Sequence, residues 1–231
     1  MTPLVIAIDG PSGAGKGTLA RRLAESLGYR HVDTGAMYRA VAWKAREEGL
    51  SLDDEEAVAA LADRAMLAQE ADRVTIDGHD VTRAIRTPEM DQAAARVARL
   101  PAVRAVLVAR QRQLGQVGGV VMEGRDIGSV VFPDAAIKVY LDASAEERAR
   151  RRAHDEAHSG GQQATVDRLQ REMVARDQSD TTRKVAPLQM AADAVYVDTT
   201  CLDAEQVFEK VRGLVEEGMG RLKIQRLKIG D

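Results

Sequence analysis

The sequence has few features of a secreted or membrane protein. Its 231 residues include a single cysteine, Cys201, which excludes a disulfide within the chain and a thiolate metal cluster. The longest apolar runs fall far short of the roughly 20 residues that a membrane-spanning helix needs, and the amino terminus is expected to enter the first strand at once. We therefore expect a soluble, cytoplasmic protein without a membrane partner.

Aromatic residues and net charge are also scarce. Phe, Trp and Tyr make up 3% of the chain and hydrophobic residues 45%, so the core has to consist of Ala, Val, Leu and Ile, which suits helices packed on a parallel sheet. A net charge of −3 argues against nucleic acid as a partner, because such binding needs a basic surface. Arginines outnumber lysines by 26 to 7, and a guanidinium can grip a phosphate through two hydrogen bonds, although codon bias would give the same excess.

Residues 10–18 read GPSGAGKGT and directly follow an apolar run at residues 4–8. The glycines let backbone N–H groups turn inward and Lys16 adds a mobile positive charge, so this loop can hold the phosphates of a nucleotide. A helix is expected at Lys16–Leu27, because leucines recur on one face, and its positive end would point at the same place. The loop residues expected to bind the nucleotide are Gly10, Pro11, Ser12, Gly13, Ala14, Gly15, Lys16, Gly17 and Thr18.

The loop departs from the strict phosphate-loop pattern, in which Ser or Thr directly follows the lysine. Gly17 intervenes here, and the hydroxyl arrives one residue later, at Thr18. A GKGT ending with a proline inside the loop is similar to the loops of nucleoside monophosphate kinases and less like those of GTPases or helicases. A dinucleotide-binding GxGxxG motif is excluded, because Thr18 stands three residues after Gly15. A glycine-rich turn without a ligand is the remaining alternative.

Five apolar segments have the length of buried strands and alternate with helical patterns. They lie at residues 4–8, 29–33, 119–122, 137–141 and 194–197. This alternation predicts a single α/β domain over residues 1–231, with three layers in which helices cover both faces of a five-stranded parallel sheet. Residues 74–81 contain Asp77-Gly78, a strong signal for a hairpin turn, and predict a small β element within an insert at about residues 50–100.

The last third of the chain predicts a lid and a tail. A capping box at residues 144–147 begins a helix rich in arginine, and the helical pattern lapses at residues 159–161, which is typical of a loop tip. We therefore expect a helical lid at about residues 148–165. RLKI occurs twice, at Arg221 and Arg226, and we interpret it as a solvated or frayed tail without a function.

Four motifs, in this order and spacing, resemble those of the bacterial cytidylate kinases, which phosphorylate CMP and dCMP. They are GPSGAGKGT at Gly10, DTGAMYR at Asp33, GRDIGSVVFP at Gly124 and RDQSDTTRKVAPL at Arg176. The resemblance spans nearly the whole chain. It implies the fold of P-loop nucleoside monophosphate kinases, ATP as the phosphoryl donor with Mg²⁺, and CDP or dCDP as the product. We expect the protein to act as a monomer.

The resemblance also implies which residues act on the substrates. Those that would bind the acceptor nucleotide are Thr34, Arg39, Arg104, Arg125, Asp126, Arg176, Asp180 and Arg183. Arg39, Arg125 and Arg183 would neutralise its phosphate, while Arg176 and Asp180 would lie beside its sugar. Those implied in catalysis are Lys16, Arg125 and Arg183.

Asp126 is implied to select the base, a role that it shares with Arg104. Cytosine has an exocyclic amino group where uracil has a carbonyl, so a carboxylate prefers cytosine. Relatives often carry Ser at the position of Ala95. Alanine cannot make the same hydrogen bond, so either a water replaces it or recognition depends more heavily on Asp126 and Arg104.

The residues taken alone leave other interpretations open. Thr34 could be an ordinary helix cap beside a solvated Arg39. Arg125 and Asp126 could form a surface ion pair, and Arg176 could bridge to Asp180 along one helix face.

Other functions fit these motifs less well. Adenylate kinases usually carry DGFPR in place of GRDIG, and shikimate kinases keep the strict GKS or GKT ending, so AMP, UMP and shikimate are alternative acceptors. A nucleotide sensor without turnover is a further alternative, against which Lys16 and the arginines argue. HDEAH at His154 and His158 resembles a zinc motif, but Asp155 stands where Glu is required, so no metal site is expected there.

Overall fold

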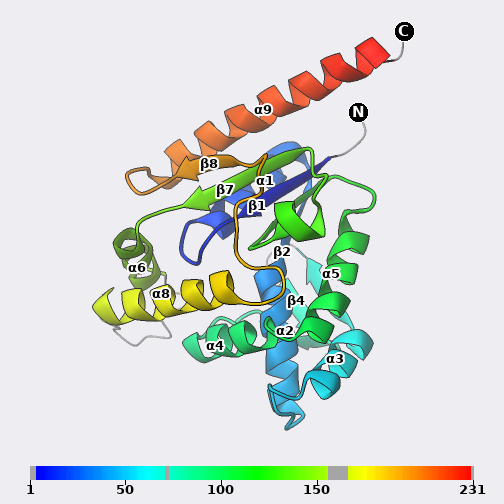
Figure 1. Ribbon diagram of the computed structural model, residues 1–231, viewed down its shortest axis with the longest axis vertical. Helices are drawn as coiled ribbons and strands as arrows, with labels where there is room; N and C mark the ends of the chain where they lie inside the picture. The colour runs from blue at the N-terminus through cyan, green and yellow to red at the C-terminus, as the bar shows by residue number, and fades with distance from the viewer. Residues whose placement is uncertain (1–3, 71–72, 156–165, 230–231) are drawn as a thin grey trace.

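A five-stranded parallel sheet forms the centre of the protein, as seen in a computed structural model that describes residues 4–70, 73–155 and 166–229 (Figure 1). Its strands are β1 (Val5–Asp9), β2 (Arg30–Asp33), β6 (Val120–Gly124), β7 (Ile137–Asp142) and β8 (Val195–Asp198). They lie in the order β2-β6-β1-β7-β8, and each neighbouring pair is parallel. Because β6 and β7 flank β1 on opposite sides, the carboxyl end of β1 is a place where such sheets bind ligands.

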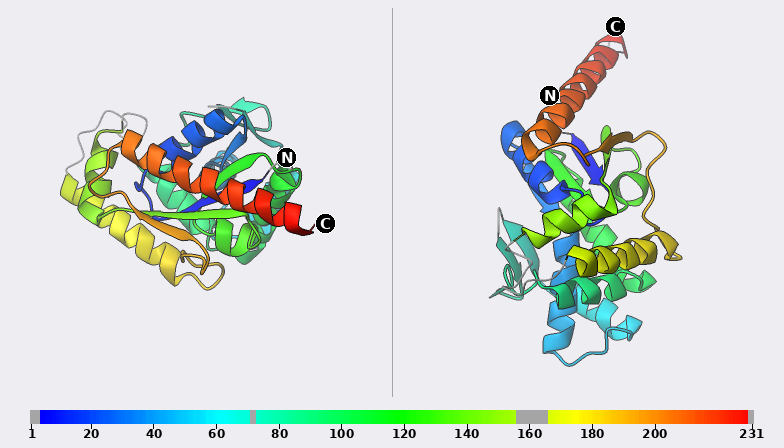
Figure 2. Two further views of the ribbon diagram at one scale, coloured as in Figure 1. Left: turned by 90° about the horizontal axis from the view of Figure 1, so that it is seen from above. Right: turned by 90° about the vertical axis from the view of Figure 1, so that its left-hand side faces the viewer.

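Helices cover both faces of this sheet (Figures 1 and 2). One face carries α1 (Lys16–Leu27) and α9 (Ala204–Ile229), and the other carries α2 (Thr34–Glu47) and α5 (Pro101–Gly115). Successive residues of a strand face opposite ways, so Ile6 of β1 packs in the core under α1 and α9 while Ala7 packs in the core under α2 and α5. The expected three-layer fold with a five-stranded parallel sheet is confirmed.

A second, antiparallel sheet lies between α3 (Glu55–Arg64) and α4 (Pro88–Val97) in the chain. Its strands are β3 (Leu67–Glu70), β4 (Arg73–Ile76) and β5 (His79–Asp80). The predicted hairpin turn is confirmed, because Asp77 and Gly78 join β4 to β5 with φ angles of 50° and 77°. The sequence did not predict β3, since LAQE has no run of β-branched or aromatic residues.

Two helices, α6 (Ala145–Ala153) and α8 (Val166–Thr182), pack against each other beside the end of the sheet (Figure 1). The predicted capping box begins α6, where Ser144 Oγ accepts the backbone N–H of Glu147 at 3.2 Å. The expected loop tip at residues 159–161 and the rest of the expected lid at residues 156–165 lie outside the described residues, as does His158.

Two further segments differ from expectation. A π-helix that the sequence did not predict, η1 (Ile127–Val131), follows β6, and Asp9 accepts the backbone N–H groups of Ile127 and Gly128 at 2.8 and 2.7 Å. Burial raises the pKa of Asp9 to about 6. The tail, expected to be solvated or frayed, is not frayed but helical as far as Ile229, and the end of α9 projects past the rest of the molecule (Figure 2). Within the described ranges, the structure holds no helix that is long and apolar enough to cross a membrane.

Candidate active site

A cavity of about 720 Å³ opens beyond the carboxyl ends of β1, β2 and β6. It brings together most of the residues that the sequence predicted. Those that line it are Ser12, Gly13, Ala14, Gly15, Lys16, Gly17, Thr18, Thr34, Arg39, Arg104, Arg125, Asp126, Arg176, Asp180 and Arg183. Gly10 and Pro11 are outside this lining and shape the base of the loop instead.

The phosphate loop requires glycine at its first position. Gly10 has a φ of +144°, and a Cβ there would run into the carbonyl oxygen of Leu141 on the neighbouring strand β7. Gly15 has a φ of +91° at the N-cap of α1, a conformation that glycine adopts without strain. The loop therefore follows closely over the end of the sheet and presents the N-terminus of α1 to the cavity.

Lys16 is buried behind this loop, and its Nζ donates to the carbonyl of Pro11 at 2.7 Å. Burial, together with the positive charge of Arg125, lowers the pKa of Lys16 to about 7, although the charge of Glu123 opposes this shift. An anionic ligand beside Nζ would restore the charged form. The protonation of Lys16 thus depends on the charged groups that lie beside its Nζ.

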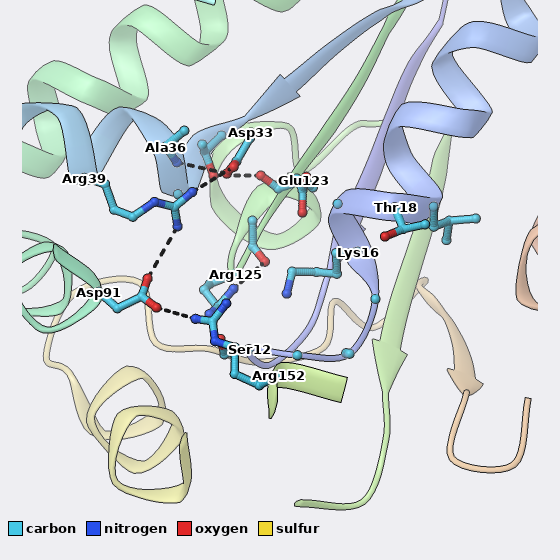
Figure 3. Close-up of a pocket in the computed structure, with 18 of the residues that line it drawn as sticks. Ser12, Lys16, Thr18, Asp33, Ala36, Arg39, Asp91, Glu123, Arg125 and Arg152 are labelled. Carbon is cyan, nitrogen blue, oxygen red and sulfur yellow. Dashed lines mark hydrogen bonds and ion pairs between the residues drawn. The ribbon is translucent and has the colours of Figure 1, made fainter. Parts of the chain in front are cut away.

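Glu123, at the end of β6, is a site residue that the sequence analysis missed. Its Oε1 lies 2.9 Å from His31 Nε2 and 3.3 Å from the position that a Cβ would take at Gly17. Register places Glu123 beside Ile8 on β1, so the carboxylate lies next to the phosphate loop (Figure 3). The available signal was an acidic residue at the end of a buried strand, directly before the GRDIG motif.

The start of α2 is organised by Asp33 and not by Thr34. Asp33 Oδ1 accepts the N–H of Ala36 at 2.9 Å, and its Oδ2 pairs with Arg39 at 2.9 Å (Figure 3). Burial would raise the pKa of Asp33, but the charge of Arg39 and the N–H of Ala36 hold it below its ordinary value. Thr34 donates its hydroxyl to the carbonyl of Glu123 at 2.7 Å. Arg39 is therefore a fixed, buried cation and not a solvated one.

Asp126 is a buried carboxylate between two arginines. Its Oδ2 accepts a hydrogen bond from Arg104, and its Oδ1 lies 3.5 Å from Arg183 Nη2. Arg104 also lies 5.7 Å from the centre of the Tyr38 ring, and burial raises the pKa of Tyr38 to about 12. Burial lowers the pKa of Arg183, and the charge of Arg104 adds to this effect. Although Arg125 and Asp126 are neighbours in the sequence, their side chains do not form an ion pair with each other.

The remaining predicted residues pair with carboxylates of other segments. Arg125 Nε contacts Asp180 Oδ2 at 3.0 Å, and Arg176 Nη1 contacts Asp91 Oδ1 at 3.0 Å. Burial would lower the pKa of Arg125, but the nearby carboxylates, Asp180 foremost with Asp177 and Asp91, together raise it above its ordinary value. Asp91 is the second site residue that the sequence missed, because an acidic residue in the first turn of a helix is ordinary.

The arginines of α6 contact different parts of the protein. Arg148 donates to Asp177 and to the carbonyl of Ser12 in the phosphate loop, the latter at 3.0 Å. Arg151 Nη1 reaches Thr199 at 2.9 Å, and Arg150 pairs with Glu147 at 2.7 Å. Arg152 pairs with Asp91.

The arrangement can hold two anionic groups next to each other. One side of the cavity offers Lys16, backbone N–H groups and a helix N-terminus, and the other offers arginines whose orientation is fixed by carboxylates. Such a site suits the transfer of a charged group between two phosphates, because fixed cations neutralise the repulsion between them.

Relatives of the chain match it along most of its length. The family model described as cytidylate kinase matches residues 6–217. A cytidylate kinase of Limosilactobacillus fermentum is 47% identical over 215 residues, which cover 92% of this chain and 95% of that protein. One of Syntrophotalea carbinolica is 49% identical over 218 residues, covering 93% and 92%.

Solved structures show likeness in the fold. A gluconokinase from Sinorhizobium meliloti has a TM-score of 0.51 at 18% identity, with 97% of this chain and 98% of that chain covered. A shikimate kinase from Bacteroides thetaiotaomicron has a TM-score of 0.50 at 14% identity, with 92% and 98% covered.

Proposed function

Because this chain belongs to the cytidylate kinase family, we propose that it transfers the γ-phosphoryl group of ATP to the phosphate of CMP or dCMP. The products are CDP or dCDP, intermediates of pyrimidine nucleotide metabolism. One observation carries this proposal: a single cavity holds both the phosphate loop and the buried carboxylate of Asp126. The loop suits a triphosphate, and the carboxylate suits a base that has an amino group.

The donor nucleotide lies with its phosphates in the loop of residues 10–18. Lys16, the loop N–H groups and the N-terminus of α1 contact these phosphates. Mg²⁺ usually takes one or two protein oxygens and shares the substrate phosphates. Glu123 and Thr18 offer a carboxylate and a hydroxyl beside the loop, so the residues fit this ion, which supplies charge neutralisation on the transferring phosphates when bound.

The acceptor nucleotide lies against the insert of about residues 50–100 and the arginine side of the cavity. Arg39, Arg125 and Arg183 neutralise its phosphate, and Arg176 with Asp180 lies beside its sugar. Asp126, oriented by Arg104, accepts a hydrogen bond from the amino group of cytosine. A uracil carbonyl would instead set a second hydrogen-bond acceptor against this carboxylate. Neither acceptor would then have a donor, at a cost of roughly 1 to 3 kcal/mol before their repulsion is counted.

The reaction needs no general base. A nucleotide phosphate has its second pKa near 6, so at neutral pH it is mostly a dianion and serves as its own nucleophile. Lys16, Arg125 and Arg183 therefore act by alignment and by neutralising charge as the γ-phosphoryl group moves in line. The lid expected at about residues 148–165 begins within α6 and precedes α8 in the chain; with these two lid helices it excludes water from this step.

A coupled assay of ADP release tests the proposal, with ATP and a panel of CMP, dCMP, UMP, AMP and shikimate. CMP and dCMP should give the highest kcat/KM. Faster turnover of UMP or AMP would show that Asp126 does not read cytosine. Tight ATP binding without turnover of any acceptor would instead indicate a nucleotide sensor.

Cellular setting and assembly are part of the same proposal. The exposed thiol of Cys201 suits a reducing compartment such as the cytoplasm, and a single cavity supplied by one chain suits a monomer that acts on small molecules and not on nucleic acid. Light scattering on the purified protein checks the monomer, with and without both nucleotides.

A further inference from the structure

Asp91 lies where the insert, the acceptor side and the lid helices meet. It is a buried residue in the first turn of α4. Its carboxylate lies 3.0 Å from Arg176 of α8 and 3.7 Å from Arg39 of α2, and it also pairs with Arg152 of α6. Figure 3 shows Asp91 between Arg39 and Arg152. One carboxylate thus joins arginines from three different helices.

The three arginines depend on Asp91 to different degrees. Arg39 has a second carboxylate, Asp33, at 2.9 Å, and Arg176 lies in the field of Asp180. Arg152 reaches Asp155 at 4.0 Å, the limit of an ion pair, and the Asp155 side chain is 41% exposed. The Arg152 side chain itself is 16% exposed. Asp91 is therefore the main buried counter-charge of Arg152.

Arg152 also differs from the other arginines of α6 in the part of the protein that it contacts. Arg148 is tied to the back of the phosphate loop, Arg151 to the loop after β8, and Arg150 to Glu147 on its own helix. Among the contacts of the described residues, Arg152 is the one of these four arginines that pairs with a carboxylate on the acceptor side of the cavity.

We propose that Asp91 is a positioning residue that holds the Arg152 guanidinium over the acceptor side of the cavity, where the phosphoryl group crosses. This inference rests on the proposed function. A buried guanidinium that loses its counter-charge turns toward water, because leaving it unpaired is costly. A cation held in place before the reaction stabilises the charge that develops during transfer. Asp91 thus acts through Arg152, and the acceptor phosphate is still bound by Arg39.

The test is a double-mutant cycle with Asp91→Asn and Arg152→Gln, measured by ADP release with CMP. Asp91→Asn keeps the shape of the side chain and removes its charge. We expect kcat to fall about tenfold or more, which corresponds to about 1.4 kcal/mol, while KM for CMP changes less than about threefold because Arg39 keeps Asp33. The double variant should be no slower than Arg152→Gln alone.

Asp53→Asn is the matched control. It removes an exposed ion pair with Arg96 in the same insert, and kcat should stay unchanged. A lower KM with an unchanged kcat would mean that Asp91 only competes with the acceptor phosphate, and additive losses in the double variant would mean that Asp91 does not act through Arg152. A lower Tm with an unchanged kcat would make Asp91 merely structural. Each of these results overturns the inference alone, whereas a wild-type protein without CMP turnover overturns the proposed function as well.

Discussion

At the scale of single residues, the acceptor side consists of guanidinium groups that each contact a carboxylate. Arg104 and Arg183 share Asp126, and Arg125 pairs with Asp180. In a buried setting such partners hold cations in place that would otherwise repel one another. Removing one carboxylate therefore disturbs its arginines as well as the contact that it makes with a ligand.

Asp126→Asn should reduce kcat/KM for CMP far more than for UMP. The amide replaces one carboxylate oxygen by an NH₂ group, which cannot accept from the cytosine amino group but can face a uracil carbonyl. Loss of a charged hydrogen bond is worth roughly 1.5 to 3 kcal/mol, or about 10- to 150-fold. The ratio of kcat/KM for CMP to that for UMP is the measurement. An equal loss for both substrates would instead assign Asp126 to holding Arg104 and Arg183 in place.

The sequence predicted which residues line this site better than it predicted which side chains pair with them. Thr34, Asp126 and the site arginines other than Arg104 stand in motifs, so their presence in one cavity could be predicted. Asp91 and Glu123 are single acidic residues whose roles depend on where α4 and β6 lie after folding. A pairing between side chains of distant elements has no local signal in one sequence.

At the scale of elements, buried strands and long helices were predictable and short irregular segments were not. Apolar runs marked all five strands of the parallel sheet to within two residues at either end. β3 and η1 have no comparable pattern: β3 is ordered by pairing with β4, and η1 is held by Asp9 from another strand. Both depend on tertiary contacts, which override local propensity.

Gly10→Ala tests how closely the phosphate loop follows the sheet. We expect a loss of about 1 to 3 kcal/mol in the free energy of unfolding, because φ at Gly10 is +144° and a Cβ would meet the Leu141 carbonyl. Urea denaturation measures it. Gly213→Ala is the control: it lies in α9 with open space around it, and alanine should stabilise that helix by about 0.5 to 1 kcal/mol. Equal effects at both positions would mean that the contact with β7 carries no weight.

At the scale of the whole molecule, the cavity is assembled from segments that lie far apart in the chain. The loop after β1, the start of α2, the end of β6 and helices α4, α6 and α8 all contribute side chains to it or to its ion pairs. Folding is therefore needed to create either binding side, and a ligand that binds only the folded state must stabilise it.

Both nucleotides should raise Tm, each through its own side of the cavity. A ligand at about 100 times its Kd stabilises the folded state by about 2.7 kcal/mol, and in a chain of this size each kcal/mol shifts Tm by about 2 to 4 °C. We therefore expect CMP, or a non-hydrolysable ATP analogue, to raise Tm by about 5 to 11 °C in a thermal melt. Asp126→Asn at the same ligand concentrations should lose about half or more of the CMP shift and keep that of the analogue, because Lys16 and the loop are untouched. If both shifts fell together, the donor and acceptor sides would not be separate sites.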